Sequence, residues 1–326
     1  MPRSILHYGK TLFLITKRSW LVIFIVACSL LIARYLDSLV DHFSHNIDFD
    51  TKYFALTIAV QVVFWLLLSV TWKNIAQLIT HARIPLLTSF SHMALVGLGK
   101  YLPGKIWGMV ARGSRMSHQG ISAAKTTVAT YLEQVLLIHA GLVLTGILTA
   151  VVFQTPVAWS IGLLSILSVI IVARYHSLLL SWLLGKLSRF GYLKTVADVP
   201  VSSFPYLRYL AAYGIIWLLS GLVFAGLFMT FLQREVLSFG LLLALVLANT
   251  AGISAGFLAL FAPGGIGVRE AVSIAALTPF MPLSDAVAIT VLSRIWLVAT
   301  DLIGGGAGLV ILHREETLVN NRSFKN

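Results

Sequence analysis

The stretch 261–270, FAPGGIGVRE, interrupts the apolar second half of the chain, and the stretch 99–105, GKYLPGK, interrupts the first half in the same way. Each places a Pro-Gly pair beside basic residues. Proline and glycine halt a helix and free backbone N–H groups, which a bilayer tolerates only where protein or a water-filled cavity surrounds them. Paired breaks of this kind in two related halves point to a transport site.

The chain around these breaks is too apolar for an ordinary soluble domain, because 58% of its 326 residues are hydrophobic and only 11% are charged. Runs of about 20 apolar residues are long enough to cross a bilayer. Such runs lie at about 19–38, 54–72, 127–153, 157–173, 209–232, 238–261 and 286–312. We therefore predict an all-α polytopic membrane protein with about 7–8 transmembrane helices and two short re-entrant or broken helical elements. An eighth crossing would run through about 266–281, but Pro279 and the pair Arg269 and Glu270 favour a short or re-entrant helix there. Segment 84–99 is apolar but short, so it is expected to be re-entrant or to lie at the interface.

The net charge of +12 is spread over short loops beside the spans, so we expect no nucleic-acid partner. Cationic loops mark the cytoplasmic side of a membrane protein. The N-terminus and the basic loops at about 73–125 and 174–208 are therefore predicted to be cytoplasmic, with the acidic loop at 41–50 outside. The basic tail at 313–326 lies on the cytoplasmic side only if the chain crosses the membrane an even number of times, and the number of crossings is left open.

The sequence predicts one membrane domain built from two related halves. The first half covers about 1–184 and the second about 208–312, with a polar linker at 185–207 and a short tail at 313–326. After each Pro-Gly pair a serine, Ser122 or Ser284, opens the next span, and serine is a good helix N-cap. Glu133 and Arg294 then follow at similar distances. These agreements predict an internal repeat; the alternative is a chance similarity between two short Pro-Gly loops.

Three charged residues lie inside predicted spans: Glu133, Arg294 and Asp301. A charge facing lipid costs several kcal/mol, so such residues face the bundle interior and pair. Arg294 and Asp301 are two helical turns apart and share one face of their span. We predict an ion pair between Glu133 and Arg294, with Asp301 deeper; the alternative is a pair that clamps helices without contacting substrate.

The Pro-Gly breaks are predicted to bind an anion, because free N–H groups and the helix dipole at a helix start favour negative charge. Basic residues beside the breaks add charge that suits a phosphate. The predicted residues for a headgroup phosphate are Lys100, Pro103, Gly104, Lys105, Arg112, Gly264, Gly265, Arg269 and Glu270. The alternative is that the cations reach out to lipid headgroups and the glycines form plain turns.

No motif indicates a cofactor, a metal or ATP hydrolysis. Cys28 is the only cysteine, and His42 and His45 lie in an acidic loop where a metal site is not expected. His139 and Asn249, inside spans, are expected to form hydrogen bonds between helices. We predict no catalytic residues and a transporter rather than an enzyme.

Taken together, GKYLPGK at 99–105, the Gly-Ile-Ser start that leads to Glu133, and APGGIGVREA at 262–271 ahead of Arg294 resemble a known family. It is the family of the lysylphosphatidylglycerol synthase transmembrane region, also called flippase-like. The resemblance covers roughly 10–312, and its most specific part is the Pro-Gly-Gly-x-Gly-x-Arg-Glu stretch.

The resemblance implies a multi-pass domain of the bacterial cytoplasmic (inner) membrane that moves an aminoacylated phospholipid between leaflets. In the bifunctional synthases a soluble aminoacyl-transferase domain follows the membrane part, and we expect no lysine transfer from this chain alone. Stand-alone members of the family look like partners of envelope glycan or lipid pathways. The partners this implies are an anionic lipid substrate and envelope glycosyltransferases or lipid-modifying enzymes.

The resulting hypothesis is a lipid translocase that moves a phosphate-bearing lipid, either a phospholipid or a polyprenyl-phosphate-linked glycan. A membrane potential contributes about 2.3 kcal/mol per charge per 100 mV, enough to bias headgroup movement. The alternatives are a membrane-embedded transferase and a non-transporting partner of an envelope-synthesis enzyme. The lipid, the direction, the energy coupling and the oligomeric state are left open.

Overall fold

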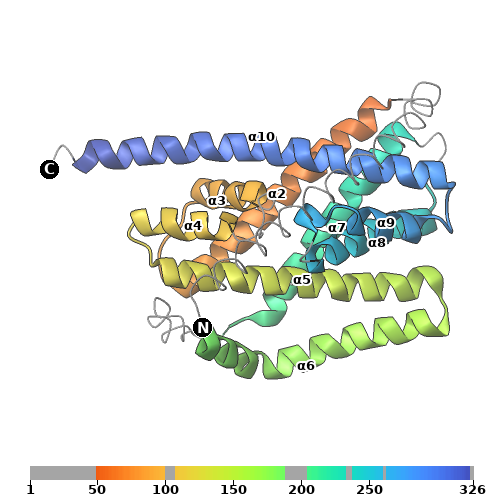
Figure 1. Ribbon diagram of the computed structural model, residues 1–326, viewed down its shortest axis with the longest axis horizontal. Helices are drawn as coiled ribbons and strands as arrows, with labels where there is room; N and C mark the ends of the chain where they lie inside the picture. The colour runs from red at the N-terminus through yellow and green to blue at the C-terminus, as the bar shows by residue number, and fades with distance from the viewer. Residues whose placement is uncertain (1–48, 100–106, 188–203, 233–236, 260–261, 324–326) are drawn as a thin grey trace, which may run out of the picture. The chain divides into compact units, whose positions relative to one another are not determined.

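The computed structural model describes residues 49–99, 107–187, 204–232, 237–259 and 262–323, and every regular element in them is helical (Figure 1). The elements are α2 (Thr51–Thr80), α3 (Leu86–Gly99), α4 (Trp107–His118), α5 (Ala123–Phe153), α6 (Pro156–Leu187), α7 (Tyr206–Phe231), α8 (Phe239–Leu258), the short 3-10 turn η2 (Pro263–Gly265), α9 (Val268–Leu277) and α10 (Leu283–Ser323). Six of these helices are long and apolar enough to cross a bilayer: α2, α5, α6, α7, α8 and α10. The all-α membrane fold is confirmed, while the predicted span at 19–38 lies outside the described residues.

Side chains at several helix starts satisfy backbone N–H groups that have no partner within the helix. The Asp50 carboxylate accepts hydrogen bonds from the N–H groups of Lys52 and Tyr53 at the start of α2, at 2.8 and 3.3 Å. The Ser122 hydroxyl caps α5 by accepting from the N–H of Lys125, as predicted. Ser284 does not cap α10, because that helix begins one residue earlier and encloses Ser284 in its first turn.

Contacts between helix ends define two ends of the bundle. The Asp50 N–H donates to the Thr230 carbonyl at 3.1 Å, which joins the start of α2 to the end of α7. The rings of Phe153 and Phe280 lie 5.9 Å apart, which places the end of α5 beside the turn between α9 and α10. One end, called the Asp50 end, therefore holds the starts of α2 and α10 and the ends of α5 and α7. The opposite end, called the Thr80 end, holds the end of α2 and the start of α5.

Two short helical hairpins enter the bundle and turn back. In the first, α3 and α4 approach so closely that a Cβ on Gly108 would lie 2.7 Å from the Val96 Cα. In the second, α8 and α9 close on each other at Gly256 and Gly265, where a Cβ on Gly256 would lie 3.2 Å from the Gly265 Cα. The first hairpin starts at the Thr80 end and the second at the Asp50 end. Segment 84–99 is thus the entering arm of a re-entrant hairpin.

The second hairpin settles the course of segment 266–281, which sequence left open. Since α9 runs back beside α8, with the Ser273 hydroxyl donating to the Ala248 carbonyl at 2.9 Å, this segment returns to the Asp50 end. The long helix α10 then runs to the Thr80 end, where Gly308 lies against Ser91 and Ala94 of α3. The predicted sides of the membrane stay a prediction.

The two hairpins belong to two half-bundles whose helices run in opposite directions. The first half-bundle is α2–α5 and the second is α7–α10. The contacts between the half-bundles correspond to one another. The first helices of the two, α2 and α7, pack on each other, and the packing of α3 on α10 matches that of α8 on α5 (Figure 1). This is the pattern of an inverted internal repeat, in which substrate sites lie at the interface of the halves. Helix α6 connects the half-bundles and packs mainly on α5, where Gly146 and Gly162 allow close approach.

Candidate functional site

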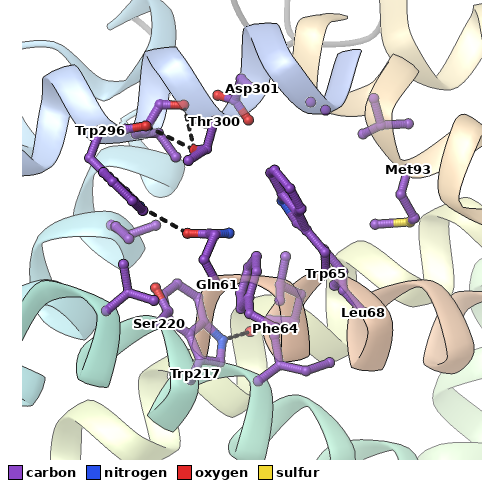
Figure 2. A pocket seen from close by; sticks show the side chains of 18 of the residues that line it. Gln61, Phe64, Trp65, Leu68, Met93, Trp217, Ser220, Trp296, Thr300 and Asp301 are labelled. Carbon is purple, nitrogen blue, oxygen red and sulfur yellow. Dashed lines mark hydrogen bonds between the residues drawn. The ribbon is translucent and has the colours of Figure 1, made fainter. Parts of the chain in front are cut away.

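A cavity of about 470 Å³ lies between the half-bundles, and helices of both contribute to its wall (Figure 2). Most of its lining is apolar or aromatic. Four charged side chains also line it: Glu133, Arg269, Arg294 and Asp301. The interface between inverted halves therefore encloses a space with both apolar walls and charged groups.

Arg294 presents an open guanidinium to this cavity. Its Nε lies 3.6 Å from the Glu270 carboxylate, and the two side chains are 19% and 24% exposed. Neither terminal nitrogen of Arg294 makes a hydrogen bond to a residue that the structure describes. Because a guanidinium binds oxyanions through paired N–H groups, Arg294 is poised to hold a phosphate or carboxylate.

The Pro-Gly-Gly turn shapes the wall beside Arg294. Gly264 has a φ of 60°, and a Cβ there would lie 3.2 Å from the Arg294 Nη2, so glycine suits both the backbone and the guanidinium. Glu270 accepts a hydrogen bond from the Gly267 N–H at 2.6 Å, which fixes the start of α9. The next side chain, Arg269, is buried, lines the cavity and donates to the Ser293 hydroxyl at 3.4 Å. Arg269 of α9 and Arg294 of α10 thus both line the cavity.

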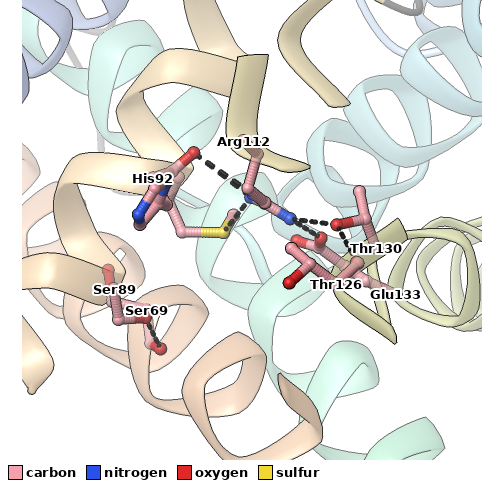
Figure 3. A network of polar contacts seen from close by, with 8 residues as sticks. Ser69, Ser89, His92, Arg112, Thr126, Thr130 and Glu133 are labelled. Atoms are coloured by element: carbon pink, nitrogen blue, oxygen red, sulfur yellow. Dashed lines mark hydrogen bonds and ion pairs between the residues drawn. The ribbon is translucent and has the colours of Figure 1, made fainter. Parts of the chain in front are cut away.

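A second ion pair, Arg112 with Glu133, joins α4 to α5 and is sealed from solvent (Figure 3). The two side chains meet at 2.5 Å and are 0% and 1% exposed. The remaining donors of Arg112 go to the His92 carbonyl, the Thr130 hydroxyl and the Met93 sulfur. Its guanidinium also lies over the Trp72 ring, 4.2 Å from the centroid. Arg112 therefore has no donor left for a substrate.

This geometry bears on two predictions. The predicted ion pair between Glu133 and Arg294 is wrong, because each has a partner on the hairpin helix beside its own span. The structure does not bring Arg112 to the cavity, since Arg112 is buried and does not line it, so its predicted role in binding a headgroup has no support in this geometry. Similar depth along two helices does not reveal which faces of those helices meet.

The other candidate residues fall into three groups. Gly264 lines the cavity, Gly265 packs on Gly256, and Asp301 lines the cavity close to Gly97. His139 and Asn249 form hydrogen bonds between helices, as predicted: His139 to Ser168 and Tyr206, and Asn249 to Ser220. The remaining candidates lie outside the described residues: His42, His45, Lys100, Pro103, Gly104 and Lys105.

Sequence reasoning missed a group of cavity residues from the middle of the spans: Gln61, Trp65, Trp217 and Trp296. The Trp296 indole N–H donates to the Gln61 amide oxygen at 3.0 Å, and the Trp217 N–H donates to the Leu137 carbonyl at 2.8 Å (Figure 2). The available signal was Gln61, an amide inside an apolar span, which has to find a polar partner. The tryptophans resemble ordinary span residues.

The site can bind an anion next to an apolar body, and the described residues contain no group of three or more His, Cys, Asp or Glu side chains that would hold a metal. No family model, curated protein or solved structure matches the chain.

Proposed function

We propose that this protein is a lipid translocase whose cavity holds the phosphate of a lipid headgroup while the lipid tails remain in the bilayer. The observation that carries the proposal is the Arg294 guanidinium, which faces the cavity with its terminal N–H groups open. Charge-assisted hydrogen bonds to an anion contribute about 1.5–3 kcal/mol each. A headgroup phosphate has the charge and the geometry to make them.

The arrangement of the half-bundles supports movement as well as binding. In transporters with inverted repeats, the substrate site lies at the repeat interface, and the two halves rock around it to open it to either side. The cavity here has that position, and it is lined by helices from both half-bundles. Arg294 itself belongs to α10, which packs on α3 of the other half-bundle. Rocking of one half-bundle would therefore change the surroundings of the bound phosphate.

The test is reconstitution of the full chain in liposomes with a headgroup-labelled anionic phospholipid and a labelled polyprenyl phosphate. We expect protein-dependent crossing of at least one of them, and a loss of about tenfold or more in Arg294→Gln. The matched control is Arg174→Gln, because Arg174 is an exposed cation on α6 that does not line the cavity. If neither lipid crosses with the wild-type protein, the translocase proposal is overturned in favour of a non-transporting partner.

A further inference from the structure

Three tryptophans line the cavity together with aliphatic side chains and phenylalanines: Trp65, Trp217 and Trp296. Two of them have their N–H groups occupied by protein, through the contacts to Gln61 and to the Leu137 carbonyl. The Trp65 ring lies against Gly304, where a Cβ would be 3.3 Å from its Cζ2, and meets the Phe90 ring edge-on at 6.1 Å. The rings are thus held in place, and what Trp217 and Trp296 offer to a ligand is ring surface.

Two buried amides line the cavity wall, each with one end bonded to a neighbouring side chain. An indole N–H can only donate, so its partner on Gln61 is the amide oxygen and the amide nitrogen keeps its donors. On Asn249 the amide nitrogen donates to the Ser220 hydroxyl at 2.9 Å, which leaves the amide oxygen as an acceptor. Gln61 is 8% exposed and Asn249 4% exposed, and both line the cavity. The wall therefore carries a donor on Gln61, which the indole contact fixes, and an acceptor on Asn249 in the orientation that the structure shows.

A phosphate alone does not account for these groups. Phosphate oxygens are acceptors and suit the two arginines, whereas the amide oxygen of Asn249, in the orientation shown, suits a ligand group that donates. Hydroxyl groups donate and accept, and the C–H face of a sugar ring packs on the face of an indole. The cavity of about 470 Å³ is much larger than one phosphate needs and falls in the range of small-ligand pockets, about 300–1,000 Å³.

From this combination we propose that the headgroup bound in the cavity is a sugar phosphate, with the phosphate at Arg294 and the sugar ring between the tryptophans and the two amides. This inference rests on the proposed translocase function, and it selects a glycosyl-phosphate lipid over a simple phospholipid as the substrate class. A flexible glycerol headgroup has hydroxyls but no rigid face to fill the space between aromatic rings.

The first test measures binding by calorimetry to the purified full chain, with three soluble probes: a hexosyl phosphate, glycerol phosphate and inorganic phosphate. We expect the hexosyl phosphate to bind about tenfold more tightly than glycerol phosphate. Trp65→Leu and Asn249→Leu should each lower the affinity for the hexosyl phosphate about tenfold and change the affinity for inorganic phosphate by no more than about twofold. Trp159→Leu is the matched control, because Trp159 is exposed on α6 and does not line the cavity.

The second test compares translocation of a polyprenyl phosphate with that of the same lipid carrying one sugar. Faster crossing of the glycosylated lipid supports the inference and assigns the sugar phosphate to a lipid source. Binding of the soluble hexosyl phosphate without crossing of either lipid would retain the sugar site but overturn the translocase proposal. Equal affinity of wild-type protein for all three soluble probes would overturn the sugar site while leaving phosphate binding at Arg294 in place. The comparison of probes on wild-type protein stands even if a variant fails to fold.

Discussion

Two ion pairs in this molecule join corresponding helices but differ in burial and in separation. Each joins the returning arm of a re-entrant hairpin to the span that follows it: Arg112 with Glu133, and Glu270 with Arg294. The charges are exchanged, because the span carries the acid in the first half-bundle and the base in the second. The first pair is buried and meets at 2.5 Å, whereas the second is partly exposed and separated by 3.6 Å. One member of each pair borders the cavity, Glu133 in the first and Arg294 in the second, but only Arg294 has open donors there.

The difference shows how a repeated element can serve two purposes. A buried pair with all its donors used holds two helices together, and losing one partner leaves an uncompensated charge. An ion pair with a long separation and an open guanidinium contributes little to stability, but it keeps a cation available at the wall of a cavity.

Breaking the sealed pair should have the largest effect on stability. Glu133→Gln and Arg112→Gln should each cost about 3–5 kcal/mol, because either change leaves a lone or poorly satisfied group in a buried site. The double change Arg112→Leu with Glu133→Leu should recover most of that loss. The measurement is the thermal unfolding midpoint of each purified variant in detergent. Losses that simply add in the double variant would show that the pair is not a coupled unit.

Breaking the open pair should affect binding rather than stability. Arg294→Gln should lower the affinity for inorganic phosphate about 10–100-fold, since it removes charge-assisted hydrogen bonds. Its unfolding midpoint should change little, because partly exposed pairs contribute about 0–1 kcal/mol. Calorimetry and thermal unfolding on the same preparation give both values. A destabilisation as large as that of Glu133→Gln would erase the contrast between the two pairs.

A side chain at Gly264 should disturb both the turn and the guanidinium. Gly264→Ala should cost about 1–2 kcal/mol because φ is positive there, and the new Cβ would press on Arg294 and weaken phosphate binding. Gly120→Ala is the matched control: φ at Gly120 is 78°, and a Cβ there would meet nothing within 4 Å. Both variants should lose stability, but only Gly264→Ala should lose phosphate affinity. Equal affinities in the two would mean that Arg294 is not confined by the turn.

Removing the charge of the Glu270 carboxylate, which competes with a bound anion for Arg294, should have the smallest effect. Glu270→Gln keeps an oxygen that can accept from the Gly267 N–H, but it removes the negative charge beside Arg294. Phosphate affinity should rise a fewfold, in line with a partly screened interaction of about 1 kcal/mol or less. Asp285→Asn, an acid outside the cavity lining, serves as the control. Lower phosphate affinity in Glu270→Gln would mean that this carboxylate orients Arg294 for binding instead of competing.

The sequence predicts which segments form helices better than it predicts which faces of those helices pack together. Long apolar runs such as 127–153 predicted long apolar helices well, since length and hydropathy decide insertion. The second Pro-Gly stretch correctly marked the break between α8 and α9, whereas the first lies beyond Gly99 outside the described residues. The partner of Glu133 was missed because Arg112 looks like one more cation of a cytoplasmic loop, and only packing of α4 on α5 buries it. The aromatic cavity was missed because Trp65 and Trp217 have no sequence signature that separates them from lipid-facing tryptophans.

The most direct test of the central claim compares lipid translocation by Arg294→Gln and by the Arg112→Leu, Glu133→Leu double variant, side by side in liposomes and normalised to folded protein. The claim is that the open pair binds the headgroup and the sealed pair only holds the fold. It predicts that Arg294→Gln loses about tenfold or more of the wild-type rate, while the double variant retains most of it. Wild-type rates in Arg294→Gln, or equal losses in the two proteins, would contradict it.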